Sequence, residues 1–253
     1  MQIFDIEYTG MDALSNAETV EGSVSGFTPI AFPKVRSTSR KGKSVEYVHD
    51  PTGNRRWHLL IASHSREDKA ADVLIENNIY AYIPRRKKPC EVNGHAKVLL
   101  TNMLPNFVFA YISRAEADFF IKGPYKDEVS YALFKERPEE ERRRILELST
   151  FLSYYYDHFS WEDGRNPPLE IPYSQMRNLI LCTRTHNENV IMPNPGDYSF
   201  KADDEVEVME GEFRGVKGRV IRADRQQRIL IELAGQFLLA TAYVPTAFLR
   251  KSV

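Results

Sequence analysis

Six histidines and two cysteines are the residues of this 253-residue chain best suited to metal binding or nucleophilic chemistry. His58, His64 and His95 lie near one another in the sequence, but no HExxH or comparable ligand spacing links them. Cys90 and Cys182 lie far apart and outside any CxxC pattern, which disfavours a disulfide scaffold, a structural zinc site and a thiol nucleophile. The spacing therefore predicts no metal site and no cofactor.

Two further patterns also fall short of an active site. Asp157 and His158 are adjacent, and neighbouring residues of a strand point to opposite faces. Gly211, Gly215 and Gly218 lie between expected strands and lack the helix that a phosphate-binding loop requires. We expect no enzyme, and the third alternative is a hydrolase that uses Asp157, His158 and the tyrosines at 154–156.

The composition is that of a soluble globular protein. Hydrophobic residues make up 42% of the chain and charged residues 27%, and the mean hydropathy is −0.43. No apolar run approaches the roughly 20 residues of a membrane-spanning helix, and the N-terminus has no signal-peptide pattern. We therefore expect a cytoplasmic protein with no membrane partner. The formal net charge of −1 disfavours a protein that coats nucleic acid by bulk electrostatics.

The charge is nevertheless uneven along the chain. Residues 1–30 carry five acidic residues and no Lys or Arg, whereas residues 31–56 carry seven Lys and Arg against two acidic residues. Neither segment shows a sustained hydrophobic period, so we expect residues 1–56 to form a loosely structured extension. A second basic cluster, a candidate for contact with nucleic acid, consists of Arg85, Arg86, Lys87 and Lys88.

From residue 57 onward the hydrophobic pattern predicts alternating strands and helices. Apolar runs predict strands, and helical spacing with capping residues predicts helices. The expected strands are 57–62, 79–83, 97–100 and 107–112; the expected helices are 66–77, 114–122 and 173–183, with helical character also at 126–150.

The C-terminal part has a different texture. Residues 192–202 contain two Pro and a Gly without periodicity, which is typical of a linker. Short strand patterns separated by turn residues follow, and they predict a small barrel that closes its own edges. These strand patterns are 205–209, 217–223, 228–234 and 237–244.

Two sets of motifs resemble NusG-like transcription factors. Residues 211–220 (GEFRGVKGRV) resemble a KOW motif, and residues 240–245 (ATAYVP) resemble the end of the KOW domain in these factors. Upstream, residues 57–60 (WHLL), Glu67 with Lys69, residues 82–84 (YIP) and residues 105–109 (PNFVF) resemble segments of the NusG N-terminal domain. Order and spacing agree over 57–123 and 151–253. Residues 166–169 (NPPL), with Gln175 and Met176, most resemble the UpxY-type antiterminators of capsular polysaccharide operons.

The resemblance implies an α+β fold in which an antiparallel sheet with packed helices is linked to a small five-stranded, SH3-like KOW barrel. The implied domains are a polymerase-binding domain at 57–191, a linker at 192–202 and a KOW domain at 203–253. The extension 1–56 and the helical insertion 126–150 fall outside the family pattern. The implied function is transcription antitermination through binding to RNA polymerase, with read-through of a long operon. The alternative is a KOW-domain protein that binds RNA or the ribosome without acting on polymerase.

The resemblance also implies two binding sites. Met103, Leu104, Pro105 and Phe107 would contact the clamp helices of RNA polymerase, and Asn106 stands where the family usually has Gly. Asn tolerates a positive φ better than other non-Gly residues, so the turn need not be lost.

The second implied site, on the KOW domain, would bind a ribosomal protein or a termination helicase. Ala234 replaces a residue that is often aromatic in the family, so we expect weak binding of the helicase. The residues of this site are Phe213, Gly215, Gly218, Leu233, Ala234 and Gly235.

Overall fold

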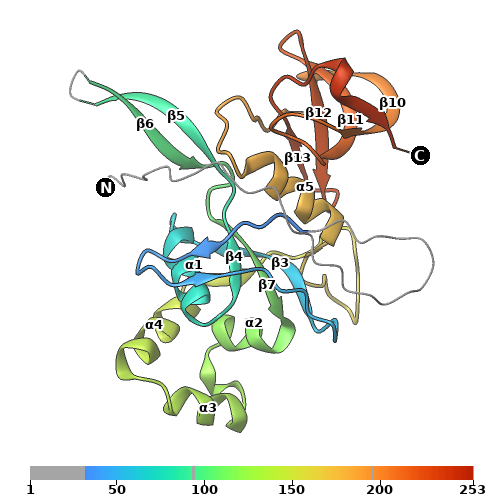
Figure 1. Ribbon diagram of the computed structural model, residues 1–253. Helices are drawn as coiled ribbons and strands as arrows, with labels where there is room; N and C mark the ends of the chain where they lie inside the picture. Colours follow the sequence, from blue (N-terminus) through green and yellow to red (C-terminus); the bar gives the residue numbers. More distant parts are fainter. Residues whose placement is uncertain (1–31, 93–94, 195, 253) are drawn as a thin grey trace. The chain divides into compact units, whose positions relative to one another are not determined.

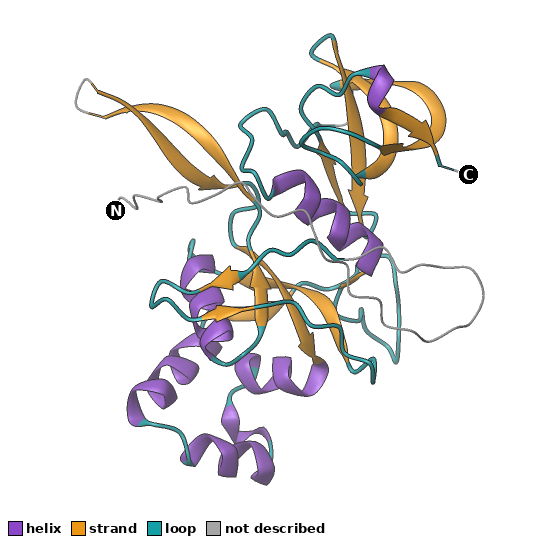
Figure 2. Cartoon of the chain, in the orientation of Figure 1, coloured by secondary structure: helices purple, strands orange, loops and turns teal. Residues whose placement is uncertain are grey.

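The computed structural model describes residues 32–92, 95–194 and 196–252. Residues 32–253 cluster as one unit, and residues 1–31 lie outside the described part of the chain. Helices and antiparallel sheets make up this unit (Figure 1), and Figure 2 separates the two kinds of element by colour. The predicted mixed α+β class is confirmed.

A central antiparallel sheet organises the first half of the described chain. Its strand order is β4 (Tyr80–Tyr82), β7 (Phe107–Ser113), β3 (Arg55–Ala62) and β8 (Leu152–Tyr154), and β9 (Glu170–Ile171) also pairs with β3. Alternate residues of β3 serve two cores, because Trp57 and Leu59 join one buried cluster while Leu60 and Ala62 join the other. Burial on both faces explains why β3 reads as a continuous apolar run.

Helices cover both faces of the central sheet. Residues of α1 (Glu67–Glu76), α2 (Arg114–Ile121) and α4 (Glu139–Ser149) belong to the second cluster, and α5 (Tyr173–Thr183) places Met176, Leu179 and Ile180 in the first.

The beginnings of α1 and α2 differ. Ser113 caps α2, and its hydroxyl accepts a hydrogen bond from the Glu116 amide while the Glu116 carboxylate accepts one from the Ser113 amide. Ser65 does not cap α1, because its backbone adopts a φ of 53° and the helix begins at Glu67.

The helical character predicted for residues 126–150 is confirmed, and this segment forms two helices. The short 3-10 helix η1 (Pro124–Lys126) leads into α3 (Glu128–Lys135), and α4 follows. Ile145 and Leu148 of α4 are buried in the second cluster, whereas α3 buries only Phe134. The insertion is therefore anchored to the domain mainly through α4.

Residues 32–54 correct the prediction of a loosely structured extension. A two-stranded sheet forms from β1 (Ser37–Thr38) and β2 (Ser44–Val45), and Tyr47 stacks on Phe32 with their ring centroids 4.0 Å apart. Tyr47 also stacks on Trp57 at 5.8 Å. These contacts come from single aromatic residues, which produce no hydrophobic period in the sequence.

The strand prediction for 97–100 covered only part of an antiparallel hairpin. β5 (Arg85–Val92) pairs with β6 (His95–Asn102) over their full lengths, and this two-stranded sheet projects away from the central sheet (Figure 1). The basic residues 85–88 therefore begin a strand instead of following one.

The C-terminal part forms an open five-stranded antiparallel sheet. Its order is β13 (Phe237–Ala240), β12 (Gln226–Leu233), β11 (Lys217–Ala223), β10 (Tyr198–Val208) and β14 (Leu249–Lys251), with the 3-10 helix η2 (Thr246–Phe248) before β14. The prediction of a closed barrel is wrong here, because the two short strands β13 and β14 remain its edges. β10 begins inside the range predicted as a linker, because Tyr198 pairs with Ala223 of β11.

Candidate protein-docking face

The four residues predicted to bind polymerase lie on the turn between β6 and β7 and at the first position of β7. We call Met103, Leu104, Pro105 and Phe107 the docking face. The Met103 amide donates to the Pro84 carbonyl at 2.8 Å, and the Phe107 amide donates to the Leu104 carbonyl at 3.2 Å. The turn is therefore held at both ends by backbone hydrogen bonds.

Asn106 shapes this turn. Its φ is 69°, so the predicted tolerance of a positive φ is confirmed. The amides of Ala62 and Ser65 donate to the carbonyl and to the side-chain Oδ1 of Asn106, both at 2.7 Å. Asn106 thus ties the docking face to the loop that follows β3.

The docking face is largely covered in this structure. Leu104 is 4% exposed, Met103 and Phe107 are partly buried against the same apolar cluster, and Pro105 is exposed. The contact with the clamp helices that the resemblance implies requires an accessible Leu104, and in this conformation Leu104 is buried. The cluster that holds Leu104 also contains residues of the C-terminal sheet such as Leu233.

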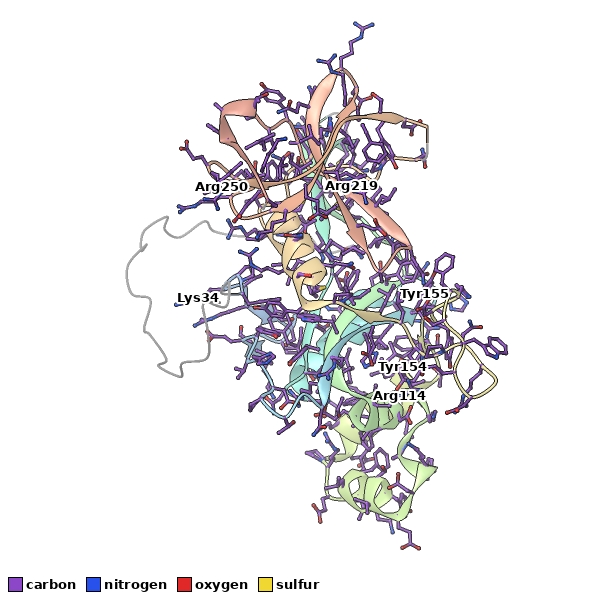
Figure 3. The ribbon with its side chains drawn as sticks, turned by 90° about the vertical axis from the view of Figure 1, so that its right-hand side faces the viewer. Lys34, Arg114, Tyr154, Tyr155, Arg219 and Arg250 are labelled. Atoms are coloured by element: carbon purple, nitrogen blue, oxygen red, sulfur yellow. The ribbon has the colours of Figure 1, made fainter. Side chains whose placement is uncertain are left out.

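Three aromatic side chains join the docking face to the C-terminal sheet. Phe107 of β7, Tyr155 after β8 and Phe237 of β13 form what we call the ring cluster. The Phe107 and Phe237 centroids are 5.5 Å apart, Phe107 and Tyr155 are 5.5 Å apart, and Tyr155 and Phe237 are 5.8 Å apart. Figure 3 shows Tyr155 where the C-terminal sheet meets the central sheet. Sequence reasoning did not find Phe237, which lies 130 residues after Phe107.

Polar side chains of α5 hold the same sheet. Gln175, Arg177 and Asn178 each form hydrogen bonds with backbone atoms of the C-terminal part. These bonds therefore depend on where the C-terminal sheet lies and not on which side chains it carries. The Ala234 amide donates to Gln175 Oε1 at 2.6 Å, Arg177 Nη1 donates to the Gly215 carbonyl at 2.8 Å, Asn178 Nδ2 donates to the Lys217 carbonyl at 2.9 Å, and the Lys217 amide donates to Asn178 Oδ1 at 3.1 Å.

The residues predicted to bind a KOW partner have structural environments of several kinds. Phe213 and Leu233 are buried in the apolar cluster. Gly218 lies so close to β12 that a Cβ atom would stand 2.1 Å from the Leu230 carbonyl oxygen.

The remaining residues of this predicted site lie in turns. Gly215 and Gly235 have φ values of 86° and 69°, and Ala234 has 48°. Through their bonds to α5, Gly215 and Ala234 face the rest of the chain.

The residues considered for catalysis form local hydrogen bonds or are buried in separate elements of the fold. Asp157 accepts hydrogen bonds from the Ser160 hydroxyl at 2.7 Å and the Phe159 amide at 2.9 Å, and these bonds lower its pKa. His58 lies in β3 at 2% exposure, where desolvation lowers its pKa to about 4. Burial in α5 raises the pKa of the Cys182 thiol. Within the described residues, no group of three or more His, Cys, Asp and Glu could hold a metal ion.

Asp118 of α2 is a buried carboxylate whose hydrogen bonds are all made within the protein's own packing. Tyr154 donates to Asp118 at 2.9 Å, and the Arg114 guanidinium lies 4.4 Å from the Tyr154 ring centroid (Figure 3). Burial raises the pKa of Asp118, but hydrogen bonds from Lys126, Lys122 and Tyr154 outweigh it and bring the pKa to about 2. The Asp118 carboxylate of α2 therefore remains charged at neutral pH, and it accepts hydrogen bonds from Tyr154, Lys122 and Lys126.

The predicted basic cluster 85–88 is divided in the structure. Arg85 forms an ion pair with Asp68, and Arg86 approaches the Val190 carbonyl at 3.5 Å. Lys87 and Lys88 are exposed and, as neighbours in a strand, lie on opposite faces of the hairpin.

Compared with models of protein families and with curated protein sequences, the chain matches none. The resemblance to NusG-like factors therefore rests on the motifs quoted above. In the described ranges, no helix has the length and apolar character needed to cross a membrane.

Proposed function

We propose that this protein is a NusG-like antitermination or elongation factor that binds the clamp helices of RNA polymerase through the docking face. On this proposal it acts in the cytoplasm by binding, without chemical turnover. It promotes read-through of a long operon, which the UpxY-type resemblance suggests serves surface polysaccharide synthesis. Nascent RNA or DNA near the polymerase is a further partner. On this proposal the KOW-like sheet recruits a ribosomal protein or, only weakly, a termination helicase, after Gly215 and Ala234 have left α5.

The ring cluster is the observation that carries the proposal. Phe107 belongs to the docking face, and the chain covers it with Phe237 from a sheet near its other end. An apolar surface gains free energy from leaving water, whichever apolar partner covers it. A polymerase helix that offers apolar side chains can therefore replace the C-terminal sheet on the same residues.

The covered face gives the proposal a regulatory consequence. Leu104 is 4% exposed, so polymerase cannot reach it in this conformation. On this proposal the C-terminal sheet, whose Phe237 contacts Phe107, moves away before polymerase binds. The apparent affinity for polymerase is then the intrinsic affinity multiplied by the fraction of open molecules. Residues 192–197, which carry no helix or strand in their described positions, provide the connection that must change.

Affinity purification from the host that carries the gene tests the proposal. The tagged full-length protein should retain core polymerase subunits, and a Met103→Glu variant should lose them because a charge would enter a desolvated apolar contact. Met209→Glu is the matched control, since Met209 is also half-buried but lies in the C-terminal part. Recovery of ribosomal particles without polymerase would favour the alternative of an RNA- or ribosome-binding KOW protein.

A further inference from the structure

The β5–β6 hairpin has two faces of different composition. Residues opposite one another in its ladder share a face, and the register pairs Lys88 with Leu99 and Cys90 with Lys97. Arg86, Lys88, His95 and Lys97 therefore lie on one face, which we call the basic face, and it carries no acidic residue. The opposite face carries Arg85 and Lys87 together with the acidic Glu91. Both faces carry apolar residues, so the difference between them lies in charge.

The two lysines of the basic face have no ion-pair partner among the described residues, whereas Arg86 approaches the Val190 carbonyl at 3.5 Å. Lys88, His95 and Lys97 are exposed, and within the described residues neither lysine forms an ion pair. This differs from Arg85, whose charge is neutralised by Asp68. Two lysine charges without a counter-ion, on a sheet that projects into solvent, attract a polyanion.

The spacing of the basic face fits a phosphate backbone. Two residues along a strand span about 7 Å, so Arg86 and Lys88 are about 7 Å apart along β5. Lys97 is the diagonal neighbour of Lys88 across the ladder, at about 7–8 Å. Phosphates recur every 3.4 Å or so along the axis of a DNA strand. Because the strand winds around that axis, consecutive phosphates lie farther apart than this rise, and successive basic residues can reach neighbouring phosphates.

The shape of the hairpin distinguishes among nucleic acids. A two-stranded ribbon enters the major groove of B-form DNA, which is about 12 Å wide, whereas the major groove of A-form RNA is too narrow for side chains to read. Single strands are bound largely by stacking of bases on aromatic residues, and the hairpin sequence 85–102 contains no Phe, Tyr or Trp. The features together favour the DNA duplex.

We propose that the basic face of the β5–β6 hairpin binds the backbone of double-helical DNA through Lys88 and Lys97, with Arg86 at the base of the hairpin. The contact carries no sequence specificity of its own, because phosphate contacts position a protein without reading bases. It stands independently of polymerase binding through the docking face.

Fluorescence anisotropy with the full-length protein and a labelled DNA duplex of about 20 base pairs tests this inference. Each of Lys88→Ala and Lys97→Ala should weaken binding several-fold and reduce the slope of log K against log salt by about 1. Lys87→Ala is the matched control, because it removes the same charge from the adjacent position but on the opposite face. The change in log K for Lys87→Ala should be less than half of the change for Lys88→Ala or Lys97→Ala.

Three results would overturn the inference. The first is an equal loss in Lys87→Ala, which would mean that only net charge matters. The second is equal or tighter binding of an RNA duplex or of single-stranded DNA of the same length. The third is no binding of the DNA duplex at low salt. Thermal melts of all three variants should coincide with that of the parent protein, since these lysines are exposed.

Discussion

Removal of the Phe237 ring should open the docking face. This ring makes a T-shaped contact with Phe107 at an interplanar angle of 70° and a tilted contact with Tyr155 at 52°. Aromatic pairs contribute about 0.5–1.5 kcal/mol each beyond the burial of area, so Phe237→Ala should cost the closed arrangement about 2 kcal/mol. That free energy corresponds to about a 30-fold shift from closed toward open molecules.

The C-terminal sheet should survive this change. Phe237 lies in an edge strand, where its backbone pairs with Leu233, and truncation of its side chain leaves this pairing intact. If closed molecules predominate, affinity for core polymerase should rise by up to the same factor of about 30.

Titration of purified protein against labelled core polymerase measures the effect. Phe200→Ala is the control, because Phe200 is a 49% exposed ring on the same sheet and its ring contacts are with Tyr198 and Arg219. NMR relaxation should show one correlation time for the parent protein and two for Phe237→Ala. Unchanged polymerase affinity in Phe237→Ala, with a shared correlation time retained, would refute the reasoning.

Three further predictions follow from local structure. The pKa of His58 is about 4 in the folded protein and about 6.5 in the unfolded chain, so the unfolded chain takes up the proton first as the pH falls. The contribution of neutral His58 to the free energy of unfolding is therefore complete above pH 6.5 or so and falls by about 3 kcal/mol as the pH drops toward 4. Urea unfolding at several pH values measures this loss. Gly218→Ala should destabilise the C-terminal sheet by at least about 1–3 kcal/mol, because its Cβ would meet the Leu230 carbonyl, and a thermal midpoint equal to that of the parent would contradict this. Asn106→Gly should lose only the hydrogen bond to the Ser65 amide, about 1 kcal/mol, whereas Asn106→Ala should lose more because it also strains a φ of 69°; equal losses in denaturant melts would count against the strained turn.

The sequence allowed prediction of the elements whose signals are local. β3 and β7 are apolar runs because both of their faces are buried, and α2 begins at the capping serine Ser113. The positive φ of Asn106 also follows from its residue type. These features depend on neighbours within a few residues, which is the range over which hydrophobic period and capping act.

Features that depend on distant contacts escaped prediction. The segment 32–54 packs on the central sheet through single aromatic residues such as Tyr47, which stacks on Trp57. Strand β5 begins with basic residues and has no apolar pattern that would predict a strand. The contact of Phe237 with Phe107 of the docking face was not predicted. Phe237 and Phe107 meet only in the folded chain, and no local pattern links residues so far apart.

Site-specific photocrosslinking at residue 103 tests the central claim most directly. A photoreactive amino acid in place of Met103, in otherwise full-length protein, should crosslink to core RNA polymerase, and the yield should rise when Phe237→Ala is added. The same probe at residue 209, in the C-terminal part, should give little crosslinking. Absence of a polymerase crosslink from residue 103 in the Phe237→Ala background, or equal yields from both positions, would contradict polymerase binding through the docking face.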